Sequence, residues 1–278
     1  MLDKKIPIGK AGKWLFDFLN DQFYWFFDGV STSLAWLINN FTELLQAIPA
    51  GLFIPLVALG AYGLQRSIKL SIFVVFALGL IVNIGYWQET MATLSLVLFS
   101  TMICMGIGIP VGIAAAHRPW LDAILKPILD MMQTIPTFVY LIPTLILFGL
   151  GVVPGLISTI VFALAAPIRL TTLGISSVPQ GLCEAAVSFG ATKRQLLWKV
   201  EIPHALPTIM AGVTQCIMLS LSMVVIAALV GADGLGKPVV RALNTVNIAK
   251  GIEAGLAIVL VAIVLDRMCK QRSSVKEV

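Results

Sequence analysis

Charged residues are scarce in this sequence. Of its 278 residues, only 12% are Asp, Glu, Lys or Arg, whereas 58% are hydrophobic. A soluble domain carries roughly a quarter charged residues, so the composition excludes an ordinary soluble protein. Apolar runs of about 15 to 25 residues recur along most of the chain, which is typical of a protein that crosses a membrane several times.

Cysteines are also few, and a nucleotide-binding motif is missing. Cys104, Cys183, Cys216 and Cys269 lack the spacing of a metal site, so we interpret them as reduced, small apolar side chains. The sequence contains no GxxxxGK[ST] phosphate loop. The net charge of +5 comes from basic residues dispersed among short loops, which does not favour nucleic-acid binding. We therefore expect no catalytic residue, metal or cofactor in this chain.

The apolar runs predict an all-α, polytopic membrane protein. The segments 49–65 and 134–150 are short and contain Pro55 and Pro143, so we expect them to be tilted, kinked or partly re-entrant. About seven spans are predicted, with boundaries good to a few residues: 49–65, 69–86, 90–116, 134–150, 153–173, 206–231 and 252–268. Together they make residues 49–278 a transmembrane domain.

Residues 1–48 form a separate N-terminal region. Residues 1–13 are a basic tail, and the stretch from Trp14 to Ile48 is rich in aromatic residues but interrupted by acidic and amide side chains. Between residues 34 and 48, apolar residues recur at three- and four-residue spacing, which predicts an amphipathic helix lying in the membrane interface. A crossing of the membrane by Trp14–Ile48 stays open as the alternative.

The distribution of basic residues predicts the orientation. Most Lys and Arg residues fall in the loops on one side of the predicted spans, and only Lys237, Arg241 and Lys250 fall in the loops on the other. The positive-inside rule then places the C-terminus and the loop 179–206 in the cytoplasm. The odd number of predicted spans puts the N-terminal tail outside, against the rule for its own lysines, unless Trp14–Ile48 crosses the membrane. His117 and His204 fall in cytoplasmic loops, where we interpret them as surface residues without a role.

The sequence of the loop 179–206 predicts its local structure. Gly190 is suited to the left-handed conformation that ends a helix, and Thr192 followed by Gln195 fits a capping box that begins a second helix. Pro203 is expected to stop that helix. The pattern predicts helix, tight turn, helix, with an apolar face and a basic rim. An amphipathic connector resting on lipid headgroups is one interpretation, and the sharp turn favours the other, a projection that docks into a partner's groove.

Seven residues of this loop resemble the EAA loop of ABC importer permeases, whose pattern is E-A-A, three residues, G, nine residues, then I-x-L-P. They are Glu184, Ala185, Ala186, Gly190, Val200, Ile202 and Pro203. The resemblance implies the type I ABC importer permease fold and a coupling helix that docks into a cytoplasmic ATPase subunit, with ATP and Mg²⁺ bound there. It also implies a second permease copy, which would make a homodimer, and a binding protein outside the cell.

Three further segments indicate which group of these importers the chain resembles. Residues 128–143, 167–171 and 222–236 are similar to the permeases of glycine betaine and proline betaine importers. The similarity implies a transport subunit of the bacterial cytoplasmic membrane that imports a quaternary-amine osmoprotectant. Choline, proline or another small solute stays open as the substrate. An ion-coupled secondary transporter is a remote alternative, because the spans contain almost no ionisable residues.

Isolated polar groups in apolar spans often face a transport pathway. The candidates are Gln133, Thr134, Thr137, Tyr140, Ser220 and Ser222. The alternative for most of them is structural, because Ser and Thr hydroxyls bond to the preceding helical turn and small residues also serve helix packing.

Overall fold

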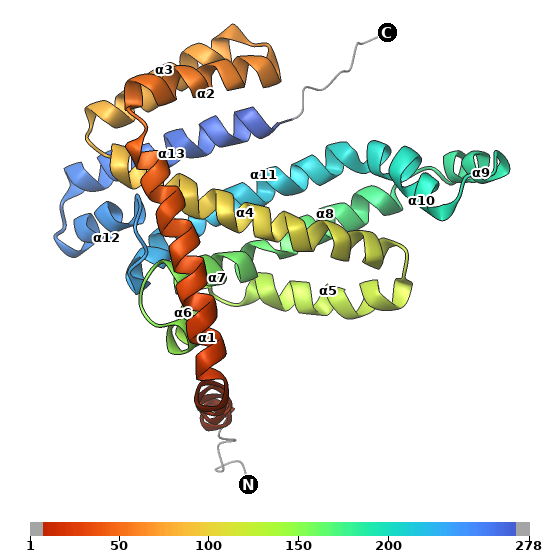
Figure 1. The fold of residues 1–278 in the computed structure, drawn as a ribbon, viewed down its shortest axis with the longest axis horizontal. Coiled ribbons are helices and arrows are strands. Elements are labelled where there is room, and N and C mark those ends of the chain that lie inside the picture. The colour runs from red at the N-terminus through yellow and green to blue at the C-terminus, as the bar shows by residue number, and fades with distance from the viewer. Residues whose placement is uncertain (1–7, 271–278) are drawn as a thin grey trace.

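The computed structural model describes residues 8–270, and within that range the chain is helical and contains no strand (Figure 1). The all-α prediction is confirmed. In chain order the elements are α1 (Ile8–Ala47), α2 (Ala50–Gln65), α3 (Ile68–Asn83), α4 (Trp87–Ala116), α5 (Pro119–Thr134), α6 (Thr137–Phe148), α7 (Val152–Ala163), α8 (Ala165–Ser176), α9 (Gln180–Ser188), α10 (Lys193–Leu196), the π-helix η1 (Leu197–Glu201), α11 (Ile202–Ala227), the 3-10 helix η2 (Ala228–Val230), α12 (Gly236–Asn244) and α13 (Ile248–Cys269).

The described helices provide between four and six membrane spans. Four segments are long and apolar enough by themselves: α4, α7 with α8, the continuous segment from α10 to η2, and α13. Two more qualify only when a bent pair counts as one span, namely α1–α2, bent by 100°, and α5–α6, bent by 96°. The predicted count of seven is not confirmed. Helices α2 and α3 have 16 residues each, or about 24 Å at 1.5 Å per residue, less than a hydrocarbon core of about 30 Å.

The predicted span 134–150 contains α6, and the 96° bend between α5 and α6 agrees with the kinked or re-entrant course expected for it. Helix α5 ends at Thr134, Ile135 is extended with φ −64° and ψ 129°, and α6 begins only at Thr137. The break occurs because Pro136 disfavours helical backbone at the residue before it. Counted as one bent span, α5 and α6 begin at Pro119, in a stretch whose charged residues lower its hydropathy below that of the other spans.

The N-terminal helix is longer than predicted. Helix α1 begins at Ile8, so it includes residues 8–13 of the predicted basic tail, and it has one kink at Phe23. In Figure 1 it runs across the direction of α4 and α11, and it packs against α4, α6 and α7. Ile38 is buried, and its carbonyl accepts a hydrogen bond from Ser95 of α4. A helix that crosses the bundle in this way fits the interfacial location, which stays a prediction; residues 1–7 lie outside the described range.

Helices α4, α8 and α11 pack closely together. Gly108 and Gly112 of α4 face Pro167 and Thr171 of α8, and a Cβ atom added at Gly112 would lie 2.6 Å from the Cβ of Thr171. Thr172 donates a hydrogen bond to the carbonyl of Gly112 at 3.1 Å. Small residues allow such close approach between helices in a membrane, where apolar burial alone does not drive association.

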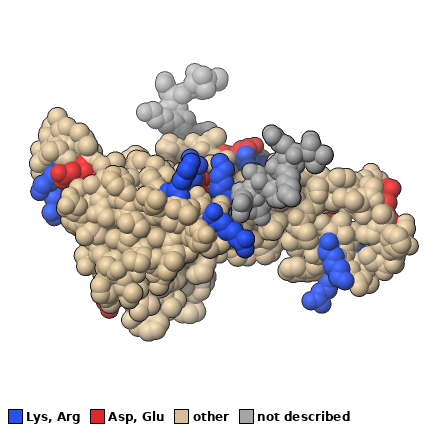
Figure 2. All heavy atoms as spheres, turned by 90° about the horizontal axis from the view of Figure 1, so that it is seen from above, with Lys and Arg blue, Asp and Glu red and all other residues tan. Residues whose placement is uncertain are grey.

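The two ends of the molecule differ. Helices α9 and α10 form a tip at one end, and α12 lies at the opposite end, with α4, α8 and α11 running between them (Figure 1). Figure 2 shows the charged side chains in separate groups with long uncharged stretches between them, and one group lies at the end where α12 is found. This separation is what a helix bundle embedded in a bilayer requires.

Candidate functional site

The tip of the molecule is the helix–turn–helix that the sequence predicts. Gly190 has φ +79°, its N–H donates to the carbonyl of Val187 at 2.8 Å, and the N–H of Ala191 donates to the carbonyl of Ala186 at 3.0 Å. These bonds cap the end of α9 and reverse the chain direction within two residues. The predicted turn at Gly190 is confirmed.

The second helix begins with the predicted capping box. The backbone N–H of Gln195 donates to the hydroxyl of Thr192 at 3.3 Å, while the backbone N–H of Thr192 donates to the side-chain carbonyl of Gln195 at 2.8 Å. Two amides that the helix itself leaves unpaired are thereby satisfied. The direction of α10 is thus fixed by local bonds and not by packing against the bundle.

The expected stop at Pro203 is wrong. The chain passes from α10 through the π-helix η1 directly into α11, so Lys193–Val230 is one continuous helical segment. Ile202 donates its N–H five residues back to Leu197, and Pro203 lies in the first turn of α11. A π-turn widens the helix locally, and proline is tolerated where its missing N–H is no loss. The tip is therefore the outward extension of a membrane span.

The EAA residues lie on the surface of α9. Glu184 and Ala185 are exposed, and Ala186 is half-buried. The carboxylate of Glu184 accepts a hydrogen bond from Gln180 one turn earlier, at 2.7 Å, so in the free chain its own helix holds it. Of the remaining motif residues, Val200 and Ile202 are half-buried, and Pro203 is exposed.

Large apolar side chains surround these residues without cover. The side chain of Phe189 is 93% exposed, and those of Leu182, Val187 and Trp198 are also exposed. Contiguous exposed apolar surface marks an interaction site. This surface, together with the capped turn, gives the tip the character of a docking element.

A contact between Glu201 and His117 joins the tip to α4 and was missed in the sequence. Glu201 of η1 is only 7% exposed, and its carboxylate lies 3.0 Å from Nε2 of His117, at the end of α4. Because the other ring nitrogen contacts the carbonyl of Ile113 at 2.9 Å, the imidazole is held between the two helices. His117 is a surface residue, as interpreted from the sequence, but its ring also contacts Glu201, which the sequence did not predict. The two residues are 84 positions apart, and no spacing in the sequence connects them.

The six pathway candidates fall in different environments. Gln133 and Thr134, at the end of α5, are exposed, while Thr137 and Tyr140 of α6 are half-buried. Ser222 is exposed and bonds to its own helix. Ser220 is fully buried, and its hydroxyl accepts a hydrogen bond from Ser100 of α4 at 3.1 Å. The structure therefore gives Ser220 a packing contact, and groups the first four candidates around the break between α5 and α6.

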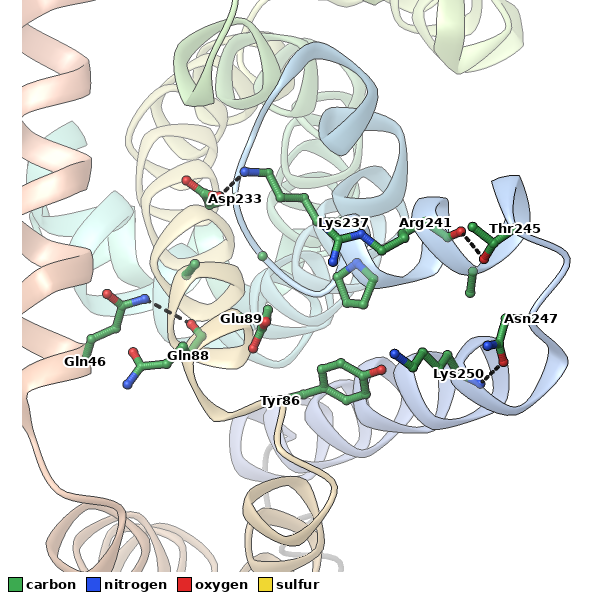
Figure 3. Close-up of a pocket in the computed structure, with 14 residues that line it drawn as sticks. Gln46, Tyr86, Gln88, Glu89, Asp233, Lys237, Arg241, Thr245, Asn247 and Lys250 are labelled. Atoms are coloured by element: carbon green, nitrogen blue, oxygen red, sulfur yellow. Dashed lines mark hydrogen bonds and ion pairs between the residues drawn. The ribbon is translucent and has the colours of Figure 1, made fainter.

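The opposite end of the molecule contains a polar cavity of about 570 Å³ (Figure 3). Glu89 lines it from α4, and Lys237 and Arg241 line it from α12, where Lys237 pairs with Asp233. Burial and, to a smaller degree, the charges of Glu253 and Glu89 raise the pKa of the Tyr86 hydroxyl, which lines the cavity from the α3–α4 turn. The lining residues come from segments between Gln46 and Lys250, so only the tertiary fold brings them together.

The turn between α11 and α12 fixes one wall of this cavity. Its glycines Gly231 and Gly234 have φ +93° and +130°, and the buried amide of Leu235 donates to the hydroxyl of Thr93 on α4 at 2.8 Å. At Gly234 a Cβ atom would lie 2.7 Å from that hydroxyl. Glycine is therefore required there both for conformation and for space.

The comparison with protein families agrees with this architecture. The model of the family "Binding-protein-dependent transport system inner membrane component" matches residues 108–270. The chain belongs to this family. The matched range extends from α4 to the end of α13 and includes the whole tip.

Close relatives cover almost the entire chain. The glycine betaine transport system permease protein OpuAB of Bacillus subtilis is 43% identical over 264 residues, which cover 95% of this chain and 93% of the relative. The glycine betaine/proline betaine transport system permease protein ProW of Escherichia coli is 46% identical over 242 residues, which cover 87% of this chain and 68% of the relative. The similarity to betaine permeases stated from the sequence is confirmed.

A solved structure supports the fold. The chain matches a permease chain of the MetNI methionine ABC transporter in inward-facing conformations with a TM-score of 0.57 and 26% identity, over 67% of this chain and 91% of that chain. The predicted type I ABC importer permease fold is confirmed. As a member of this family, the chain is a multi-pass transport component of the membrane.

Proposed function

We propose that this chain is the permease subunit of an ATP-driven importer for glycine betaine or a related quaternary-amine osmoprotectant. The observation that carries the proposal is the identity of 43% and 46% to two betaine permeases over most of the chain. In such an importer the permease supplies the membrane pathway and converts the motion of the ATPase into alternating access.

The tip formed by α9, α10 and η1 would dock onto the ATPase. Glu184, Ala185, Ala186 and Gly190 would shape the contact, with Glu184 free to exchange its Gln180 partner for a basic residue across the interface. The continuity of α10, η1 and α11 supports transmission, because a helix that extends from the tip into the membrane moves as one body. Val200, Ile202 and Pro203 lie in or beside the π-turn of that helix.

The remaining subunits follow from the same proposal. ATP and Mg²⁺ would bind to the separate ATPase, a binding protein outside the cell would deliver the solute, and a second copy of this chain would complete the pathway. The tip and the C-terminus would face the cytoplasm of a bacterial cell, as the positive-inside rule predicts, and the N-terminus would lie outside, as an odd number of spans requires. Since a receptor selects the solute, choline, proline or another small solute is the alternative substrate, and an ion-coupled transporter is the alternative mechanism.

The test is uptake of labelled glycine betaine into proteoliposomes. The chain is reconstituted alone and then with its ATPase and binding protein, with and without ATP. The complete complex also carries Glu184→Lys, which reverses the charge at the docking surface, or Gln180→Ala, which removes only the intrahelical partner of that carboxylate.

We expect uptake only with all partners and ATP, loss of uptake with Glu184→Lys, and uptake that persists with Gln180→Ala. Uptake by the chain alone, driven by a sodium or proton gradient, would contradict the ATP-driven mechanism. ATP-driven uptake of choline or proline without uptake of betaine would contradict the substrate while leaving the mechanism in place.

A further inference from the structure

Helix α5 has three distinct faces. One face packs against α4, α7 and α8 through Leu125, Leu129 and Met132. The other two are uncovered in the single chain. The first of these is apolar and consists of Trp120, Ile124, Ile128 and Met131, all of them exposed.

The second uncovered face is a polar stripe, which consists of Asp122, Lys126, Asp130 and Gln133. Its positions are offset by two residues from those of the apolar face, which places the two faces about 200° apart around the helix. The stripe extends along α5 from near the α4–α5 turn, on the side of the molecule where α9 and α10 lie, toward the break at Pro136 (Figure 1).

Ion pairs connect the stripe. Lys126 and Asp122 are 2.6 Å apart, one turn from each other. Asp130 is 2.5 Å from Arg169, which comes from α8. The Asp130 side chain is 66% exposed and that of Arg169 is 39% exposed, so neither is enclosed by the single chain.

Hydrocarbon cannot cover such a face. Charged side chains at membrane depth face water or other protein, because exposing them to lipid is expensive. The apolar face of α5 is suited to lipid, so the polar stripe is the face that meets water or other protein. The three charges of the stripe and the charge of Arg169 cancel in pairs. The surface therefore has no net attraction for an anion or a cation.

We propose that the polar stripe of α5 and Arg169 line the half of the transport pathway nearer to the tip, and that Asp130 and Arg169 form a transient site for a zwitterionic solute. The solute carboxylate takes the guanidinium of Arg169 while its cationic end takes the carboxylate of Asp130, so that one ion pair is exchanged for two. A guanidinium binds a carboxylate through two parallel hydrogen bonds. The solute site rests on the proposed function, because it assumes that a betaine is transported.

The first experiment tests the lining. In a Cys183→Ser, Cys269→Ser background, Lys126→Cys and Gln133→Cys report the stripe, and Ile124→Cys and Ile128→Cys report the apolar face of the same helix. The complete transporter in proteoliposomes is treated with a charged, water-soluble methanethiosulfonate. We expect labelling of the stripe to be about tenfold faster or more, because the reactive thiolate forms in water and not in lipid. Equal rates on both faces would overturn the lining.

The second experiment tests the solute site. Labelling of Gln133→Cys is repeated with glycine betaine, with choline, which lacks the carboxylate, and with 3,3-dimethylbutanoate, which lacks the positive charge. We expect protection by betaine alone, and loss of that protection with Arg169→Gln. Protection by none of the three, or by choline equally well, would overturn the site. A complex that does not import betaine at all would refute the proposed function and with it the solute site. The difference in labelling rate between the two faces of α5 would still test whether the stripe lines the pathway.

Discussion

The conformation of Gly190 should decide how well the tip docks. The residue has φ +79°, and a Cβ atom added there would meet nothing within 4 Å. Gly190→Ala therefore introduces no clash, and its whole effect is the cost of placing a residue with a Cβ in the left-handed region, about 1–2 kcal/mol. That energy reduces the population of the observed turn, relative to relaxed alternatives, by about 5- to 30-fold.

Affinity for the ATPase should follow that population. When only part of the molecules adopt the binding-competent conformation, the apparent dissociation constant rises in inverse proportion to that part. We therefore expect Gly190→Ala permease in nanodiscs to bind the purified ATPase subunit up to about 5- to 30-fold more weakly, measured by biolayer interferometry. Gly190→Asn should fall between the wild type and Gly190→Ala, because asparagine tolerates the left-handed region better than alanine.

Gly181 provides a matched control. It lies in the first turn of α9, and a Cβ atom added there also meets nothing within 4 Å, but its backbone is helical. Gly181→Ala should leave ATPase binding intact, because alanine favours helix by up to about 1 kcal/mol over glycine. Equal affinity of Gly190→Ala and Gly181→Ala for the ATPase would refute the argument that the turn geometry controls docking.

Three further substitutions test contacts elsewhere in the fold. Gly112→Leu should overpack the contact of α4 with α8 and destabilise the protein by about 1–3 kcal/mol, seen as a lower melting temperature in detergent, whereas Gly106→Leu on the same helix has open space and should change it little. His117→Ala should cost about 1–3 kcal/mol because it leaves the buried carboxylate of Glu201 without its partner, and Glu201→Gln in the same chain should recover part of that loss. Thr93→Val should expose the α11–α12 turn to faster amide hydrogen exchange, while Thr93→Ser, which keeps the hydroxyl, should not; unchanged exchange in both would show that the hydrogen bond does not hold the turn.

The residues of the tip illustrate what local sequence determines. Gly190, Thr192 and Gln195 specify their geometry through bonds that span at most five residues, so the pattern alone predicts a capped helix, a tight turn and a second helix. Hydropathy likewise identifies the spans at α4, α7–α8, α11 and α13, because a long apolar helix is a property of contiguous residues. The role of the tip in coupling stays a prediction.

Mean hydropathy is a poor guide to a helix that has one charged face and one apolar face. Helix α5 carries charges on one face and apolar residues on another, and averaging along the sequence combines the two, so α5 was left out of the predicted spans. The end of the second helix of the tip was also predicted wrongly, since a π-turn carries the chain past Pro203 without a stop.

Other features depend on contacts between distant segments. The pairs His117–Glu201 and Arg169–Asp130, the serines Ser100 and Ser220, and the cavity beside α12 all join residues far apart in the chain. Sequence spacing determines a helix, its cap and its amphipathic faces, because those interactions repeat every three or four residues. Which face of one helix meets which face of another is decided only by packing of the folded chain, and there the polar stripe of α5 first comes together with Arg169.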